Sequence, residues 1–110
     1  MLEPGVLLQA STLALEHSPL PADQVVAGSP AFGTAVLVDG APEVGVWEHT
    51  PGTSTDVEVD ELFVVLAGDA TLLIEGRGPL DLGPGAVVRL AEGMRTTWVV
   101  RETLRKLYIA

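Results

Sequence analysis

The stretch Thr55–Leu66, TDVEVDELFVVL, alternates in side-chain character along its length. Successive side chains of a β-strand point to opposite faces of a sheet, so an alternating stretch is typical of a strand with one buried face. One set of positions is largely apolar and consists of Thr55, Val57, Val59, Glu61, Phe63 and Val65. The other set begins with Asp56, Glu58 and Asp60, which predicts a solvated face. The stretch therefore favours a β-fold in which this strand covers the interior.

Glu61 is the charged residue in the apolar set, so it is predicted to point into the interior. Burial raises the pKa of a carboxylate unless a cation or several hydrogen-bond donors compensate. A carboxylate in such a place is a candidate acid, base or ligand anchor. The alternative is a structural salt bridge between Glu61 and an arginine or Lys106.

Short apolar runs bounded by glycine or proline fill most of the remaining chain, which contains 12 glycines and 8 prolines in 110 residues. This composition predicts turns between short strands. The further strands are predicted at Ala35–Val38, Val44–Glu48, Ala70–Ile74, Leu80–Leu82, Ala86–Leu90, Thr96–Val100 and Arg105–Ile109. No βαβ unit fits between these runs. The predicted fold class is all-β, a single small antiparallel β-barrel with residues 35–110 as its core.

The first 34 residues are predicted to contribute one strand and one loop to the same domain. The strand is expected at Val6–Glu16, although its leucines fit neither the strand nor the helix period. Residues 18–34 are rich in proline and glycine and are expected to form an ordered loop that wraps over the barrel. At 110 residues, the chain is predicted to be one domain, residues 1–110.

Composition excludes several functional classes. The chain has no cysteine, which rules out thiolate catalysis, iron–sulfur clusters and cysteine zinc sites, and fits a reducing compartment. Its formal charge of −9 repels phosphate backbones and anionic lipid surfaces, so neither nucleic acid nor a membrane is expected as a partner. No signal peptide or membrane span is apparent, which predicts a cytoplasmic protein.

A set of spaced motifs identifies a family resemblance. Glu61 stands seven residues before Gly68, and the segment Gly83-Pro84-Gly85 is followed by Gly93 and Thr96. This spacing resembles the two motifs of the cupin superfamily, which implies a jelly-roll barrel. Metal-binding cupins have two histidines ahead of the glutamate and a third in the second motif. The corresponding positions are Thr55, Val57 and Thr96, so Glu61 alone remains and the sequence predicts no metal and no cofactor.

Further segments narrow the resemblance to small cupins related to ureidoglycine aminohydrolase and to an ethanolamine-utilisation accessory protein. They are Gly45–Gly52 (GVWEHTPG), Glu61–Phe63, Gly83–Gly85, Thr97-Trp98 and Arg105–Tyr108. Ala86 and Ala91 depart from the usual aspartate and proline of that branch. The resemblance also implies a homodimer.

Other candidate residues each have a functional and a structural interpretation. Trp47 and Trp98 could wall a ligand pocket together with Phe63, or they could be barrel packing. His49 could be a general base near the barrel mouth or a rim residue without a catalytic role. Lys106 could bind a ligand carboxylate, act as a nucleophile, or pair with an acid.

Two hypotheses about function follow from these residues. In the first, the barrel binds a small polar or cationic metabolite without a metal, with a site made of Trp47, Glu61, Phe63, Thr96, Trp98 and Lys106. In the second, it is an isomerase or a hydrolase of carbon–nitrogen bonds, with Glu61 as the acid or base and His49 or Tyr108 assisting. The period of the last strand does not decide whether Lys106 and Tyr108 or Leu107 and Ile109 point inward.

Overall fold

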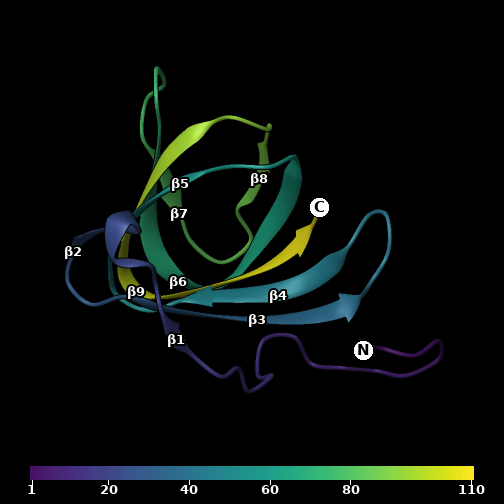
Figure 1. Ribbon diagram of the computed structural model, residues 1–110. Coiled ribbons are helices and arrows are strands. Elements are labelled where there is room, and N and C mark those ends of the chain that lie inside the picture. The colour runs from purple at the N-terminus through teal and green to yellow at the C-terminus, as the bar shows by residue number, and fades with distance from the viewer.

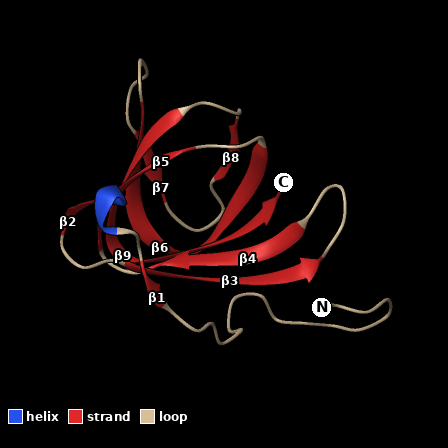
Figure 2. Ribbon diagram, viewed as in Figure 1, coloured by secondary structure: helices blue, strands red, loops and turns tan.

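The computed structural model describes residues 1–110 as one antiparallel sheet that curls into a barrel (Figure 1). Strands make up nearly all of its regular structure, and a single short 3-10 helix interrupts them (Figure 2). The strands are β1 (Ser18–Pro19), β2 (Val25–Ala27), β3 (Ala31–Val38), β4 (Val44–His49), β5 (Gly52–Val57), β6 (Glu61–Ile74), β7 (Leu80–Leu82), β8 (Val87–Leu90) and β9 (Arg95–Ile109), and the 3-10 helix η1 is Ala22–Gln24. The predicted all-β cupin-type barrel is confirmed.

The long strand β9 organises the sheet. Along one edge it pairs first with β5 and then with β4, while β6 pairs along its other edge. Strands β7 and β8 pair with the far edge of β6. Because paired residues share a face, the β4 register sets Trp47 beside Lys106, and the β5 register sets Ser54 beside Trp98.

The interior side of β9 is thereby decided. Lys106 and Tyr108 are buried, whereas Leu107 is half-buried on the outer face and Ile109 is exposed there. An apolar cluster fills much of the barrel and includes Phe63, Leu72, Leu90, Trp98 and Leu104. The polar side chains of the interior therefore gather beside this cluster.

A bulge at Gly68 keeps both halves of β6 facing the core. Phe63 and Val65 are buried before it, and Ala70 and Leu72 are buried after it, so the inward positions change from odd to even numbers. The pairing with β9 shifts register between Val65 and Ala70. A bulge of this kind needs a residue that tolerates unusual backbone angles, and Gly68 has a φ of +108°.

The strand predicted at Thr55–Leu66 is wrong in its extent, because the chain leaves the sheet between β5 and β6. Glu58 turns into the interior there, and Val57 and Val59 are 55% and 58% exposed rather than buried. The backbone of Glu58 bonds to the loop ahead of β9, donating its N–H to the Met94 carbonyl at 2.9 Å and accepting from the Gly93 N–H at 2.9 Å. These loop contacts replace the strand pairing that alternation predicted.

The strand predicted at Val6–Glu16 is also wrong. The N-terminal segment, residues 1–17, contains turns and no strand, and it runs outside the barrel beside β3 (Figure 1). The Leu2 N–H donates to the Leu37 carbonyl at 2.7 Å, so the segment is tied to β3 at that point. The predicted wrapping loop, residues 18–34, instead contains η1, the two short strands β1 and β2, and the start of β3, and β2 pairs with β5.

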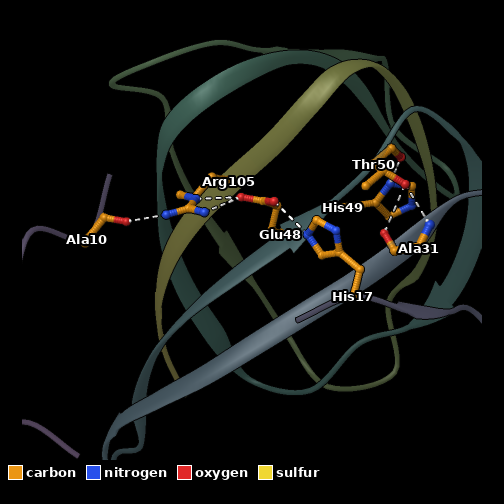
Figure 3. A network of polar contacts seen from close by, with 7 residues as sticks. All are labelled: Ala10, His17, Ala31, Glu48, His49, Thr50 and Arg105. Carbon is orange, nitrogen blue, oxygen red and sulfur yellow. Dashed lines mark hydrogen bonds and ion pairs between the residues drawn. The ribbon is translucent and has the colours of Figure 1, made fainter. Parts of the chain in front are cut away.

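A buried ionic network holds the N-terminal segment against the outer face of β4 and β9 (Figure 3). Glu48 Oε2 accepts a hydrogen bond from Arg105 Nε at 2.6 Å, and Glu48 Oε1 lies 2.7 Å from His17 Nε2. Arg105 Nη1 also donates to the carbonyl of Ala10 at 2.9 Å.

The structure contains no helix with the length and apolar character that a membrane span requires.

Candidate functional site

A cavity of about 360 Å³ opens into the barrel between β4, the β5–β6 turn and β9. This volume lies at the small end of the range for sites that bind small molecules. Two tryptophans and four ionisable side chains dominate its lining: Trp47, Glu58, Glu61, Trp98, Lys106 and Tyr108. Asp56, Thr34 and exposed valines complete it. The cavity is therefore an aromatic and charged site within a largely apolar barrel.

Lys106 forms the inner wall of this cavity. Its Nζ donates to Glu61 Oε2 at 2.7 Å. The same Nζ lies 4.5 Å from the ring centroids of Trp47 and Phe63, and 4.7 Å from that of Trp98. Glu61 thus lines the cavity while it is paired with Lys106, which is the structural alternative named from the sequence.

Glu58 is the functional candidate that sequence reasoning missed. Its Oε2 accepts hydrogen bonds from Thr96 Oγ1 at 2.6 Å and from Trp98 Nε1 at 3.2 Å. Burial raises the pKa of the Glu58 carboxyl, although these donors and Lys106 oppose the increase. A proton on this carboxyl would reside on Oε1, because Oε2 already accepts twice. Glu58 can therefore present either a hydrogen-bond donor or a charge to the cavity.

The sequence could not reveal Glu58, because the strand signal passes through it unbroken. Because Val57 and Val59 flank Glu58, the alternating pattern predicts that Glu58 lies on the solvated face. No glycine or proline lies between Thr55 and Leu66 to mark the turn. The prediction that Glu58 belongs to a solvated face is wrong.

His49 is buried in the barrel wall and not at its rim. Its Nδ1 lies 2.6 Å from the Thr50 carbonyl oxygen, so Nδ1 has the proton and donates it. Its Nε2 then accepts from Ser54 Oγ at 2.8 Å. Burial lowers the pKa of His49, although the hydrogen bond to the Thr50 backbone opposes the decrease, so the imidazole is neutral at pH 7. His49 borders a separate hollow of about 250 Å³ behind Trp47 and Trp98.

Tyr108 lines the cavity with its phenol oxygen engaged. Its hydroxyl donates to Glu43 Oε2 at 2.7 Å. Burial, followed by this contact with Glu43, raises the pKa of Tyr108, so the phenol remains protonated at neutral pH. Phe63 and Thr96 do not line the cavity: Phe63 packs behind Lys106, and Thr96 is a buried donor to Glu58.

The donor set at this site does not fit the metal that the cupin resemblance implies. Ser54 is buried on β5, so the next residue, Thr55, points to the opposite face of the strand, and Val57 has no side-chain atom that could bind a metal. Thr96 donates to Glu58, and Glu61 is bonded to an ammonium group. No group of three or more histidine, aspartate or glutamate side chains is arranged to hold a metal ion. Transition metals require about three or four such ligands.

Comparison with known structures finds proteins with the same fold. A Pseudomonas syringae protein of unknown function, assigned to the DUF861 family, shares 23% identity over 90% of this chain and 45% of its own, with a TM-score of 0.78. Clostridium difficile EutQ shares 20% identity over 73% of this chain and 61% of its own, with a TM-score of 0.63. The chain thus spans 45% and 61% of the length of these two proteins, which is less than two-thirds of either.

A further similar structure is a putative ethanolamine utilization protein Q from Salmonella typhimurium. It shares 17% identity over 88% of this chain and 96% of its own, with a TM-score of 0.64. No curated protein matches the sequence. Residues 37–108 match the family described as the EutQ-like cupin domain, and this match covers well over half of the chain. The protein therefore belongs to the EutQ-like cupin domain family.

Proposed function

We propose that this domain binds a small polar or cationic molecule in the cavity that Trp47 and Trp98 line, without using a metal ion. The observation that supports it best is the lining itself, in which two indole rings and several ionisable side chains border one small cavity. Apolar walls with a few placed polar groups are typical of small-molecule sites.

The charges of the lining favour a ligand with hydrogen-bond donors or a positive group. Asp56, Glu58 and Glu61 contribute carboxyl groups, whereas Lys106 is the one cation. Glu61 and Lys106 neutralise each other in their ion pair. Asp56 and Glu58 are then left to receive a ligand amine, amide or hydroxyl group, since charge-assisted hydrogen bonds are the strong ones.

The same contacts give no support to catalysis by Glu61 with Tyr108. The carboxylate of Glu61 is held by Lys106, and the phenol of Tyr108 donates to Glu43. His49 lies beside the other hollow, behind the tryptophans. The relation to ureidoglycine aminohydrolase, the homodimer and the cytoplasmic location stay predictions.

The two tryptophans offer a direct test, because the chain has no others and both line the cavity. We expect a small amine or amide that binds to shift the indole N–H signals of both Trp47 and Trp98 in a two-dimensional NMR titration. Glu58→Gln is expected to weaken binding of such an amine about tenfold or more, because a charged hydrogen bond is lost. Glu102→Gln makes the same charge change at an exposed site and should not alter affinity. Bound compounds that leave both indole signals unmoved would refute the cavity as the site.

The affinity for an amine is expected to increase with pH. Because burial raises the pKa of Glu58 above its ordinary value of 4.5, Glu58 keeps its proton at pH values where an exposed glutamate has lost it. An alkylammonium stays charged over this range, since its pKa is about 10. Its dissociation constant should therefore fall as pH is raised from 4.5 through the Glu58 pKa. Calorimetric titrations should show that the dissociation constant depends on pH in the wild type and depends on it less in Glu58→Gln. An equal pH dependence in the two proteins would exclude Glu58 from the site.

A further inference from the structure

The inner end of the cavity is a nearly complete binding site for an ammonium group, and Lys106 fills it. Three aromatic rings surround Nζ, all within 4.7 Å, and they come from β4, β6 and β9. The carboxylate of Glu61 completes the cage at 2.7 Å. The Lys106 side chain is only 5% exposed.

Each part of this cage is chemically suited to a cation. The face of an aromatic ring attracts a cation within about 6 Å of its centroid, and the attraction grows when water is excluded. A buried cation is costly unless an opposite charge and hydrogen bonds compensate it. Glu61 provides that charge and one hydrogen-bond acceptor, and the aromatic rings surround the rest of the ammonium group.

The cage is also fixed in place by its own packing. The Trp47 and Trp98 centroids are 5.5 Å apart, and those of Phe63 and Trp98 are 5.7 Å apart, so the rings support one another. The Trp98 indole N–H donates to Glu58, which restrains that ring further. The rings are therefore arranged by contacts other than those with Lys106.

We propose that the cage of Trp47, Phe63, Trp98 and Glu61 is a site for a primary alkylammonium group, which the chain occupies with its own Lys106. The barrel then has an organic cation built into its interior, paired with the glutamate whose counterpart is a metal ligand in metal-binding cupins. A ligand in the outer part of the cavity meets this occupied cage as its inner wall. The proposal does not require that such a ligand exist, so it goes beyond the proposed function.

The proposal is tested by removing the Lys106 side chain from the cage and adding a small ammonium compound that could take its place. Lys106→Ala removes the three outer carbons and the ammonium, and these atoms correspond to n-propylammonium. We expect n-propylammonium to raise the melting temperature of Lys106→Ala in a concentration-dependent way and to shift the Trp47 and Trp98 indole signals. The neutral analogue 1-propanol should do so far more weakly. In Lys106→Ala combined with Glu61→Gln, the affinity for n-propylammonium should be lower by about tenfold or more.

Lys106→Met is the matched control, because methionine refills the apolar part of the space without a charge. It should respond to neither compound. Equal stabilisation of Lys106→Ala by 1-propanol and n-propylammonium would overturn the proposal, as would a folded Lys106→Ala that binds neither. Titration of the wild type measures separately whether a ligand binds in the outer part of the cavity. A negative result for the cage would therefore not decide whether that ligand binds.

A measurement on the wild type covers the case in which Lys106→Ala does not fold. Lys106 is the only lysine of the chain, so acylation of a lysine side chain reports on it alone. In the folded protein its acylation should be at least about tenfold slower than in urea, where the cage is lost, because the amine is enclosed and bonded to Glu61. Equal rates in the folded and unfolded protein would contradict an occupied cage.

Discussion

Gly68→Ala is expected to leave little folded protein. Gly68 has a φ of +108°, which strains any other residue, and a Cβ at this position would lie 2.7 Å from the Leu104 Cα and even closer to the Thr103 carbonyl oxygen. Both atoms belong to the backbone of β9, which cannot move without breaking its pairing with β6. Strain and overpacking together should cost about 2–6 kcal/mol. A large part of the stability of a small domain would be lost.

Gly76→Ala is the matched control for this prediction. Gly76 also has a positive φ, +81°, but nothing lies within 4 Å of the place that its Cβ would occupy. Only the backbone strain remains, so the free energy of unfolding should fall by about 1–2 kcal/mol. Urea denaturation followed by circular dichroism measures both variants. Similar losses at the two glycines would show that β6 and β9 do not approach as closely at the bulge as described.

Arg105→Met is expected to destabilise the protein by about 3–5 kcal/mol, because it leaves the buried carboxylate of Glu48 without its main cation. The Arg105 and Glu48 side chains are only 10% and 11% exposed. The substitution also removes the donor to the Ala10 carbonyl, so residues 1–17 should become more susceptible to limited proteolysis. Urea denaturation measures the first effect, and mass spectrometry of the digest measures the second.

Arg101→Met provides the comparison. Arg101 pairs with Asp69 at 2.8 Å, but these side chains are 47% and 52% exposed. An exposed ion pair contributes at most about 1 kcal/mol. A second check is to combine Arg105→Met with Glu48→Leu, which removes both buried charges and should recover much of the loss. Equal losses for Arg105→Met and Arg101→Met would mean that the Glu48 network is not buried as described.

The fold could be predicted largely from local sequence signals. Several predicted strand bounds are close, and Leu80–Leu82 is identical in prediction and structure, but β3 and β6 continue through Gly33 and Gly68. The turn after Val57 contains no glycine or proline, so the alternating pattern predicts a strand that continues through it. The N-terminal segment could not be assigned either, because contacts with residues far along the chain, such as Arg105 with Ala10, hold it in place.

The site could be predicted only in part. The alternation of a strand shows which of its side chains share a face, but it does not show which other strand pairs with it. Glu61 and Lys106 were both identified as candidates, and their pairing was one of the alternatives. The orientation of the last strand required the registers that set Lys106 beside Trp47 and Val65. Glu58 was missed because its role arises from a turn and from two donors about 40 residues away, Thr96 and Trp98.

The claim that the interior cation is Lys106 and not a metal ion is tested most directly by elemental analysis. The protein should be purified without a histidine tag, incubated with manganese, nickel or zinc, and freed of excess metal by gel filtration. We predict metal well below one ion per chain for the wild type. Close to one ion per chain, lost in Glu61→Gln, would contradict the claim and would make a metal centre at Glu61 the better description.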